Sequence, residues 1–453
     1  MIDMLKRIKI LAAVLIILLT AGCRAATMRV SEEKKINLTF SFWEPGVHTE
    51  LEDGLKKVIN EYEKLHKNVH IELISVPVAD YDNYIKERMV SGNLPDIQSN
   101  NGTQLEMQMQ KGLIVDIRDV LEKESAYYSG TLWKDTFEPK YTEWSQNPDK
   151  PIVGIPFFGV GIGIFYNKTM YERLGLCVPE TWGEFMYNCE VIQNAGKQPI
   201  AFMTNKSDAR DWLEWEVSAG LYGEADLKNR ELNIDGDSRI TESEIAQYIK
   251  NTSFDMTTDK EYQDRYKNYI NHISQFLSYC TESADYEERV AKTVFLNGEA
   301  GHIHSGSWDV ISFMKNPNVG FEVGVFEFPK FAREDTPYPG DGVQVLSAQC
   351  LALTKSVNSE AGKKEAAVDF LQYLTSADVY RDFISDTFQI PTVKGTPTDK
   401  DLECFINDEG NKFYSFMTMG DGDIIYDIIV GNAPVIDDKY FSNKMKNVLK
   451  YQE

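Results

Sequence analysis

The chain has 453 residues and carries a net charge of −23 at neutral pH. A surface this acidic repels phosphate backbones, which argues against nucleic acid as a partner and favours a neutral ligand over an anionic one. The six cysteines have neither the density of a disulfide scaffold nor the CxxC spacing of a metal site. We expect most of them to be buried small hydrophobic residues, namely Cys177, Cys189, Cys280, Cys350 and Cys404.

The first residues have the pattern of a secretory signal peptide. A short positively charged start precedes an apolar run at 8–19, which is shorter than the roughly 20 residues needed to cross a bilayer. Cys23 follows Ala-Gly, as in a bacterial lipobox. We therefore expect residues 1–22 to be removed, Cys23 to be lipidated and residues 23–35 to form a linker at the outer face of the bacterial cell membrane. Ordinary cleavage beside an incidental cysteine is the alternative.

A chain this long exceeds one compact core, so two lobes are expected. Polar and apolar residues alternate over 36–42 and 69–73, which predicts strands, whereas 51–65 and 84–89 have the apolar spacing of helices. Strands and helices in this order indicate crossover units around a largely parallel sheet. The polar, proline-containing stretch 145–151 is the expected crossing into the second lobe.

The rest of the chain continues this α/β pattern. Thr181 and Glu184 match a capping box, which predicts a helix that begins at Trp182 and ends near Gly196. The other expected elements are a strand at 163–167, mostly helical structure over 222–290, strands near 293–311 and over 343–354, and an amphipathic helix over 361–374.

Short motifs in a shared order resemble those of a known family. They are Phe42-Trp43 and the segments 91–97, 155–156, 164–168, 175–182, 295–300, 306–308, 345–348 and 389–391. Each motif is weak alone, but their order and spacing are specific and span most of the chain. The sequence thereby resembles the family 1 extracellular solute-binding proteins, the group that includes maltose-binding protein.

This resemblance implies an α/β fold of two lobes, joined by hinge strands around a ligand cleft. It places 36–147 and 343–394 in the first lobe, and 148–342 and 395–453 in the second. By the same resemblance the chain is a monomer and not an enzyme. It would close its lobes on a carbohydrate, such as an oligosaccharide, and deliver it to the membrane permease of an ABC importer.

A sugar presents apolar C–H faces and a rim of hydroxyls, so its site needs flat aromatic side chains and short polar ones. Trp308, in Gly306-Ser307-Trp308, matches a tryptophan that stacks on sugar in several relatives. Trp182 and Asp96 are expected to be structural instead. The candidate ligand-binding residues are Trp43, Asn100 and Asn101 in the first lobe and Asn205, Asp208, Trp212 and Trp308 in the second.

Residues 233–244 match an EF-hand-like calcium loop. Two departures weaken the match, because position one holds Asn in place of Asp and position six holds Ser238 in place of Gly. A polar turn followed by a capping box is the alternative. A structural calcium ion would be held by side-chain oxygens and one main-chain carbonyl, from Asn233, Asp235, Asp237, Arg239 (carbonyl), Thr241 and Glu244.

Other patterns give no support for an enzyme. The glycines of 159–163 precede a strand and not the helix that a phosphate loop requires, and His302 and His304 lack a third metal ligand at a recognisable spacing. No GxSxG, HExxH or P-loop motif occurs. A secreted carbohydrate-active hydrolase with two opposed carboxylates and a glycan-binding adhesin lipoprotein are the alternatives to a transport protein.

Overall fold

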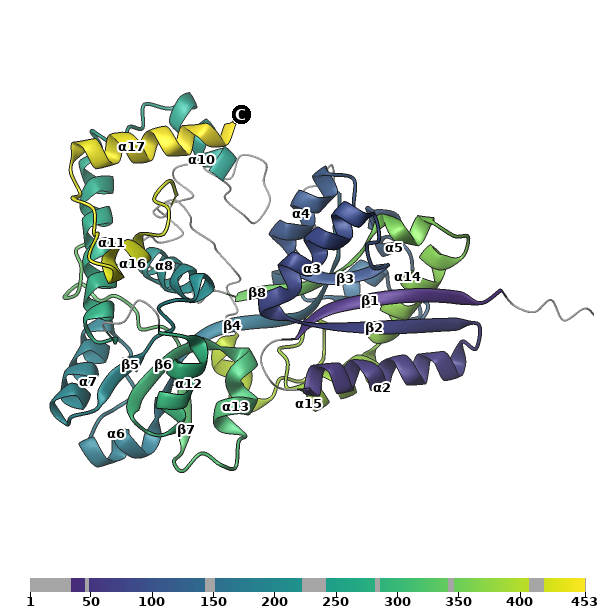
Figure 1. The fold of residues 1–453 in the computed structure, drawn as a ribbon, viewed down its shortest axis with the longest axis horizontal. Coiled ribbons are helices and arrows are strands. Elements are labelled where there is room, and N and C mark those ends of the chain that lie inside the picture. Colours follow the sequence, from purple (N-terminus) through teal and green to yellow (C-terminus); the bar gives the residue numbers. More distant parts are fainter. Residues whose placement is uncertain are drawn as a thin grey trace, which may run out of the picture.

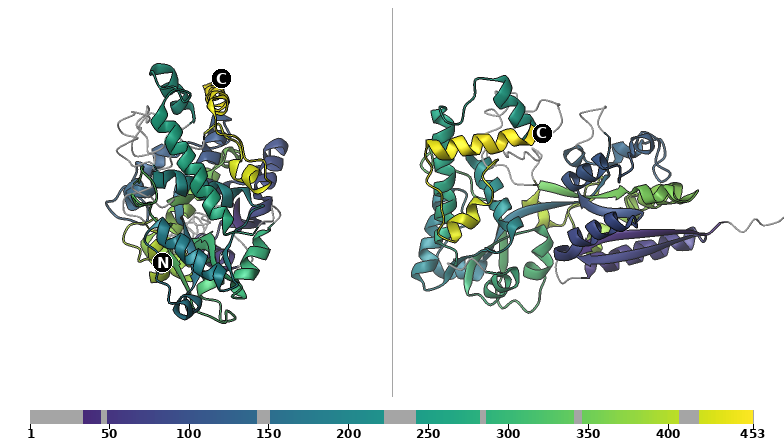
Figure 2. Two further views of the ribbon diagram at one scale, coloured as in Figure 1. Left: turned by 90° about the vertical axis from the view of Figure 1, so that its left-hand side faces the viewer. Right: turned by 45° about the horizontal axis from the view of Figure 1, so that its top comes forward.

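Two hydrophobic cores, each built around its own part of one sheet, divide the protein into two lobes (Figure 1, Figure 2). The computed structural model describes residues 34–44, 49–142, 151–221, 242–281, 286–340, 346–406 and 419–452. The sheet runs in the order β2-β1-β3-β8-β4-β6-β5, with β7 paired to β4. This continuous sheet joins the lobes, because β4 belongs to both of them.

The first lobe begins with the predicted crossover units. Strands β1 (Ile36–Glu44), β2 (Val69–Pro77) and β3 (Ile97–Asn101) are parallel, and they alternate with helices α2 (Glu50–Leu65) and α3 (Val78–Ser91). The alternating apolar side chains of β1 are buried, as the sequence pattern predicts. Two later helices, α14 (Lys363–Leu374) and α15 (Ala377–Thr387), complete this lobe.

The chain crosses between the lobes inside a single long strand, β4 (Ile155–Asn167). Its first half pairs with β8 (Leu346–Leu353), and Phe157 lies in the first core. Its second half pairs with β6 and β7, and Phe165 lies in the second core. The crossing therefore lies after the predicted boundary between 147 and 148. The predicted boundary was placed at 145–151 because turn-forming residues there interrupt the pattern of strands and helices. The crossing itself lies within a continuous strand, where no run of turn-forming residues marks it.

The second lobe surrounds β5 (Gln198–Ala201), β6 (Ala300–Gly306) and β7 (Val323–Phe326). The predicted capping box is present, because Glu184 N donates to Thr181 Oγ1 and Thr181 N donates to Glu184 Oε2. The helices that cover this sheet in the second core are α7 (Trp182–Asn194), α8 (Ser207–Leu221), α11 (Lys260–Ser278) and α12 (Glu288–Leu296).

Two details differ from the sequence expectations. The sheet is less parallel than predicted, because β8 pairs antiparallel with β3 and β4, and β4 pairs antiparallel with β6 and β7. The strand expected near 293–311 is only β6, since α12 occupies its start. Short apolar-rich runs do not distinguish helix from strand by periodicity.

The remaining helices connect these layers or form the C-terminal part of the second lobe. After Leu402 the chain packs in the second core, near the predicted boundary at 394–395. These helices are α4 (Gly102–Gln110), α5 (Arg118–Leu121), α6 (Lys168–Leu174), α10 (Glu242–Asn251), α13 (Val310–Met314), α16 (Ile424–Ile429) and α17 (Asp438–Val448).

The expectations for the cysteines and the first residues have different outcomes. Cys189 is buried, but Cys177 is exposed, and the other cysteines expected to be buried are intermediate. Among the described residues, no helix is both long and apolar enough to cross a membrane. The predicted signal peptide and Cys23 lie outside the described part of the chain.

Candidate functional site

Two of the predicted tryptophans meet in the second lobe. Trp212 lies on α8, and Trp308 lies in the 3-10 turn (Ser307–Asp309) that follows β6. Their ring centroids are 4.9 Å apart and the rings are inclined by 54°. Both side chains are half-buried, so part of each ring remains accessible. Because parallel strands β5 and β6 end at one edge of the sheet, the segments that follow them come together there.

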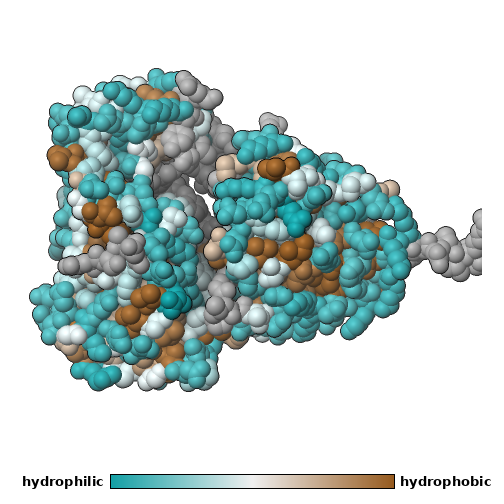
Figure 3. Space-filling model, viewed as in Figure 1, coloured by the Kyte–Doolittle hydropathy of each residue, from teal (hydrophilic) through white to brown (hydrophobic). Residues whose placement is uncertain are grey.

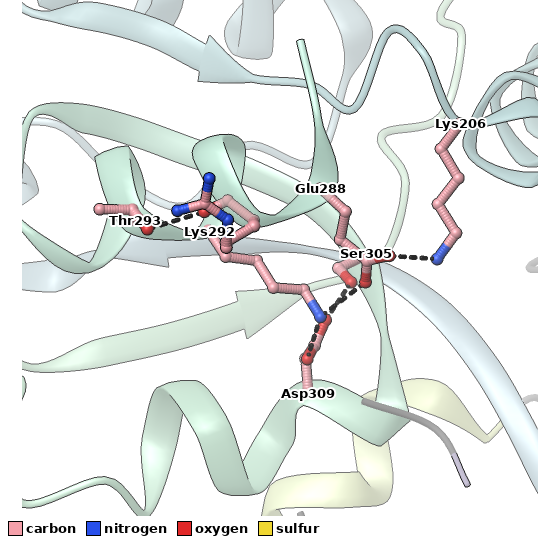
Figure 4. A network of polar contacts seen from close by, with 7 residues as sticks. Lys206, Glu288, Lys292, Thr293, Ser305 and Asp309 are labelled. Atoms are coloured by element: carbon pink, nitrogen blue, oxygen red, sulfur yellow. Dashed lines mark hydrogen bonds and ion pairs between the residues drawn. The ribbon is translucent and has the colours of Figure 1, made fainter. Parts of the chain in front are cut away.

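A chain of paired charges (Figure 4) begins beside Trp212 and ends at Asp309, the residue after Trp308. Lys206 Nζ lies 5.4 Å from the Trp212 ring centroid and 2.8 Å from Glu288 Oε2. Lys292 Nζ then joins Glu288 Oε1, at 2.8 Å, to Asp309 Oδ1, at 2.7 Å. Asp309 directly follows Trp308, so this network supports the segment that carries the ring.

The charges of this network are mutually stabilised. Burial would lower the pKa of Lys292, but Asp309 and Glu288 outweigh it and raise that pKa above its ordinary value. Burial would likewise raise the pKa of Glu288, and Lys292 and Lys206 outweigh it and lower that pKa. Lys292 and Glu288 are therefore charged at neutral pH and neutralise one another. The network leaves little net field for an anionic ligand.

The other predicted residues of the second lobe, Asn205 and Asp208, precede Trp212 in the chain. Asp208 lies four residues before Trp212 on α8, so the two side chains share one face of the helix. Asn205 precedes the helix, and both polar side chains are exposed. Asp208 therefore offers hydrogen-bonding groups on the helix face that carries Trp212, and Asn205 offers them just before the helix.

The predicted residues of the first lobe already have partners within that lobe. Trp43 packs against Tyr81 with ring centroids 6.2 Å apart. Asn100 is buried, and its Oδ1 accepts the backbone N–H of Asn101. Asn101 caps α4, because its Oδ1 accepts the N–H of Gln104 at 2.9 Å. Among the described residues, no hydrogen bond or ring contact joins this set to Trp212 or Trp308.

Sequence reasoning missed Glu44, which follows Trp43 at the carboxyl end of β1. Burial, followed by the nearby carboxylates of Glu52, Glu50 and Asp53, raises its pKa to about 8. A carboxyl group that is protonated at neutral pH donates a hydrogen bond as well as accepting one. An acidic residue next to Trp43 at a strand end is the signal that would have identified it. The Lys206–Glu288–Lys292–Asp309 network had no comparable signal.

The residues expected to be structural are indeed engaged in the fold. Trp182 is buried, and its Nε1 donates to Gln275 at 2.9 Å. Asp96 Oδ2 accepts the backbone N–H of Thr39 at 2.9 Å, and its Oδ1 lies 2.8 Å from Lys363 Nζ. These interactions hold β1 and α14 against the segment before β3.

The two histidines of β6 have protein partners. His302 Nδ1 donates to the carbonyl of Pro199 at 2.9 Å, so its Nε2 accepts from the Tyr171 hydroxyl at 2.5 Å. Burial lowers the pKa of His302 to about 3, which keeps it neutral. His304 Nε2 lies 2.6 Å from Glu216 Oε2. Both imidazoles therefore contact polar groups inside the second lobe.

Most of the predicted calcium loop lies outside the described residues. Glu244, the last of the predicted ligands, lies on α10 and is buried. In the parts of the chain that are described, no group of three or more His, Cys, Asp or Glu side chains is placed to hold a metal ion. Asn233, Asp235, Asp237, Arg239 and Thr241 lie in the undescribed segment.

These features define a class of protein. Two α/β lobes are connected through β4 and β8, and Figure 3 shows the molecule hollowed between them. Aromatic and polar groups gather at the ends of strands in each lobe. This arrangement is that of a two-lobe ligand-binding protein, in which the ligand contacts both lobes.

Comparison with known proteins identifies the family. The family described as bacterial extracellular solute-binding protein matches residues 57–421, so this chain belongs to that family. The multiple sugar-binding protein of Streptococcus mutans is 25% identical over 84% of this chain and 81% of its own length. The melibiose/raffinose/stachyose-binding protein MelE of Bacillus subtilis is 26% identical, over 41% of this chain and 40% of its own.

Solved structures confirm the fold. The structure of the solute-binding protein RafE in complex with raffinose aligns with a TM-score of 0.65 at 16% identity, covering 92% of this chain and all of the other. A chitin oligosaccharide binding protein aligns with a TM-score of 0.66 at 18% identity, covering 92% of this chain and 98% of the other. The two-lobe α/β architecture expected from the sequence is therefore correct.

Proposed function

We propose that this protein is the solute-binding subunit of an ABC importer and that it captures a carbohydrate between its lobes for a membrane permease. The observation that carries the proposal is the Trp212–Trp308 pair at the strand ends of the second lobe. Aromatic faces stack against the C–H faces of sugars, and the exposed Asn205 and Asp208 beside them suit sugar hydroxyls. The binding-protein relatives, whose names include several sugars, support the same ligand class.

The charge balance around the site also supports a neutral ligand. The lysines nearest the tryptophan pair are already matched by Glu288 and Asp309. An anionic ligand would have to compete with these carboxylates, whereas a sugar needs only hydrogen bonds and an apolar surface. An oligosaccharide fits a site to which two lobes contribute.

Thermal unfolding with a panel of mono- and oligosaccharides tests this function. The chain without residues 1–22 is heated with each sugar, and the sugar is then recovered and identified. A ligand that binds only the folded state adds about 2.7 kcal/mol of stability at a hundredfold excess over Kd. We expect a higher melting temperature with one class of sugar, recovered intact. Recovery of cleaved sugar would instead support a hydrolase, and no shift with any sugar would contradict a carbohydrate ligand.

The anchoring of the protein is a second part of the proposal. Cys23 follows the lipobox-like Ala-Gly, and the family is extracellular, which supports lipidation after removal of residues 1–22. A monomer held by lipid would present its ligand to the permease. Fatty-acid labelling of cells that express the wild type and Cys23→Ala tests the anchor. We expect label only in the wild type, and label in both would contradict it.

A structural calcium ion at 233–244 is the third part. The oxygen ligands at loop positions one, three, five and twelve support it, and α10, which bears Glu244, packs against α17. Removal of calcium by a chelator should lower the melting temperature of the wild type. Asp235→Ala should show the lower value with or without calcium. Equal melting temperatures for the wild type in calcium and in chelator would contradict the site.

A further inference from the structure

The indole ring of Trp308 rests on the backbone of Gly306. A Cβ atom at residue 306 would lie 2.2 Å from ring atoms Cζ3 and Cη2 of Trp308. Gly306 is buried at the end of β6, and its φ of −127° and ψ of 179° are extended values open to any residue. Residue 306 must therefore be glycine because the Trp308 ring occupies the space that a side chain would need, and not because of its backbone conformation.

The second tryptophan is tied to the same strand through a buried contact. Trp212 lies one turn before Glu216 on α8, and Glu216 Oε2 lies 2.6 Å from Nε2 of His304 on β6. Both side chains are almost fully buried, at 1% and 0% exposure. Water therefore does not compete for this contact, and it fixes α8 against β6 close to both rings.

We propose that Gly306 and the Glu216–His304 pair are positioning residues of the carbohydrate site, because they set the distance and angle between the rings of Trp308 and Trp212. This inference rests on the proposed function, which assigns the two rings to the sugar. Stacking depends on ring orientation, so a shifted Trp308 would lose contact with the ligand even in a fully folded protein. Gly306 touches no ligand in this account and acts through Trp308.

Circular dichroism of the chain without sugar tests the geometry directly. Two indole rings this close couple their electronic transitions, and the wild type should show paired bands of opposite sign that Trp308→Phe removes. In Gly306→Ala the new methyl group displaces the ring, so these bands should weaken or change sign. The same variant should bind its sugar about tenfold more weakly in a calorimetric titration, since one oriented aromatic contact is lost. Glu216→Gln should show smaller changes of the same kind.

Gly301→Ala is the matched control, because Gly301 lies on the same strand and is also buried. Its Cβ would meet Ile192 Cδ1 at 2.6 Å, in the core and not in the aromatic pair. We expect a lower melting temperature but unchanged coupled bands. Unchanged bands in both Gly306→Ala and Glu216→Gln would overturn the positioning role. Altered bands with unaltered sugar affinity would overturn its connection to binding, whereas a wild type that binds no sugar would overturn the proposed function itself.

Discussion

The two lobes use their predicted site residues in different ways. In the second lobe, Trp212 and Trp308 contact each other and remain partly accessible beside a balanced set of charges. In the first lobe, Trp43 packs against Tyr81 and Asn101 caps a helix. The comparison indicates that the second lobe carries a preformed aromatic surface. The first lobe would then complete the site when the lobes approach, with Glu44 as its polar contribution.

The largest effect is expected from a half-buried, ion-paired lysine in each lobe, Lys292 in the second and Lys363 in the first. Lys292→Met leaves Asp309 without its cation and Glu288 with Lys206 alone, and we expect a loss of about 3–5 kcal/mol in the free energy of unfolding. Lys363→Met in the first lobe should cost less, because it removes one ion pair, to Asp96, whereas Lys292→Met removes two. Urea denaturation measures both.

Sugar affinity separates these two variants further. Lys292→Met should also weaken binding, since the network supports Trp308, whereas Lys363→Met should leave the Kd unchanged. If Lys292→Met and Lys363→Met lost the same stability and bound sugar with the same Kd, neither lysine would support the sugar site more than the other.

Removal of a ring should affect the second lobe more than the first. Trp308→Ala should raise the Kd for sugar about a hundredfold, equivalent to about 2–3 kcal/mol, because the preformed surface is lost. Trp43→Ala should raise it by about tenfold or less, since much of that ring is engaged with Tyr81. Calorimetric titration gives both values. A larger effect at Trp43 would reverse the assignment of the two lobes.

A pH dependence should originate in the second lobe, where Glu214 is buried on α8. Burial, then the charges of Asp421, Asp211 and Asp423, raise its pKa to about 9, against the opposing effect of Lys444. The folded state therefore keeps a proton that the unfolded chain releases above about pH 4.5, so stability falls as pH rises from there to about 9. Glu214→Gln should remove about 1–3 kcal/mol of this decline.

Urea denaturation at about pH 5 and about pH 9 measures this decline in both proteins. The wild type and Glu214→Gln should differ little at the lower pH, where the carboxyl is protonated in the fold. Parallel loss of stability in the two proteins would show that another group is responsible.

The smallest effect concerns the cap in the first lobe. Asn101→Ala should cost about 1 kcal/mol in stability, because the N–H of Gln104 loses its acceptor. Asn101→Asp keeps an acceptor and should restore that stability. If Asn101 also bound sugar in the closed form, Asn101→Ala would weaken sugar binding by more than the loss of stability explains. The first lobe would then contribute directly to binding, as the second lobe does.

Much of the fold could be predicted because local signals agreed with it. The alternation of Phe40 and Phe42 gave the first strand, and Thr181 with Glu184 gave the start of α7. The crossing inside β4 could not be predicted, because its glycines lack side chains that would indicate which face of the strand is covered. Gly161 in fact packs against Phe405, which arrives from a distant part of the chain.

The sequence proposed the candidate site residues singly and not as a set, and their binding of a ligand stays a prediction. Trp308 was proposed from a motif and Trp212 from a strand end, whereas the contact between their rings depends on how α8 packs against β6. Lys292 and Glu288 have the spacing of an ordinary exposed helix pair, so nothing in the sequence indicated that Lys292 also pairs with Asp309. Long-range packing, rather than local pattern, decides which charges support a site.

A crystal structure of the chain with a bound oligosaccharide tests whether the two lobes enclose the sugar against the tryptophan pair. We expect a sugar whose C–H face lies on Trp308 and Trp212 at the end of β6, with the two lobes closer together than in the unliganded protein. A sugar bound only to one outer surface, with the tryptophan pair free, would contradict it.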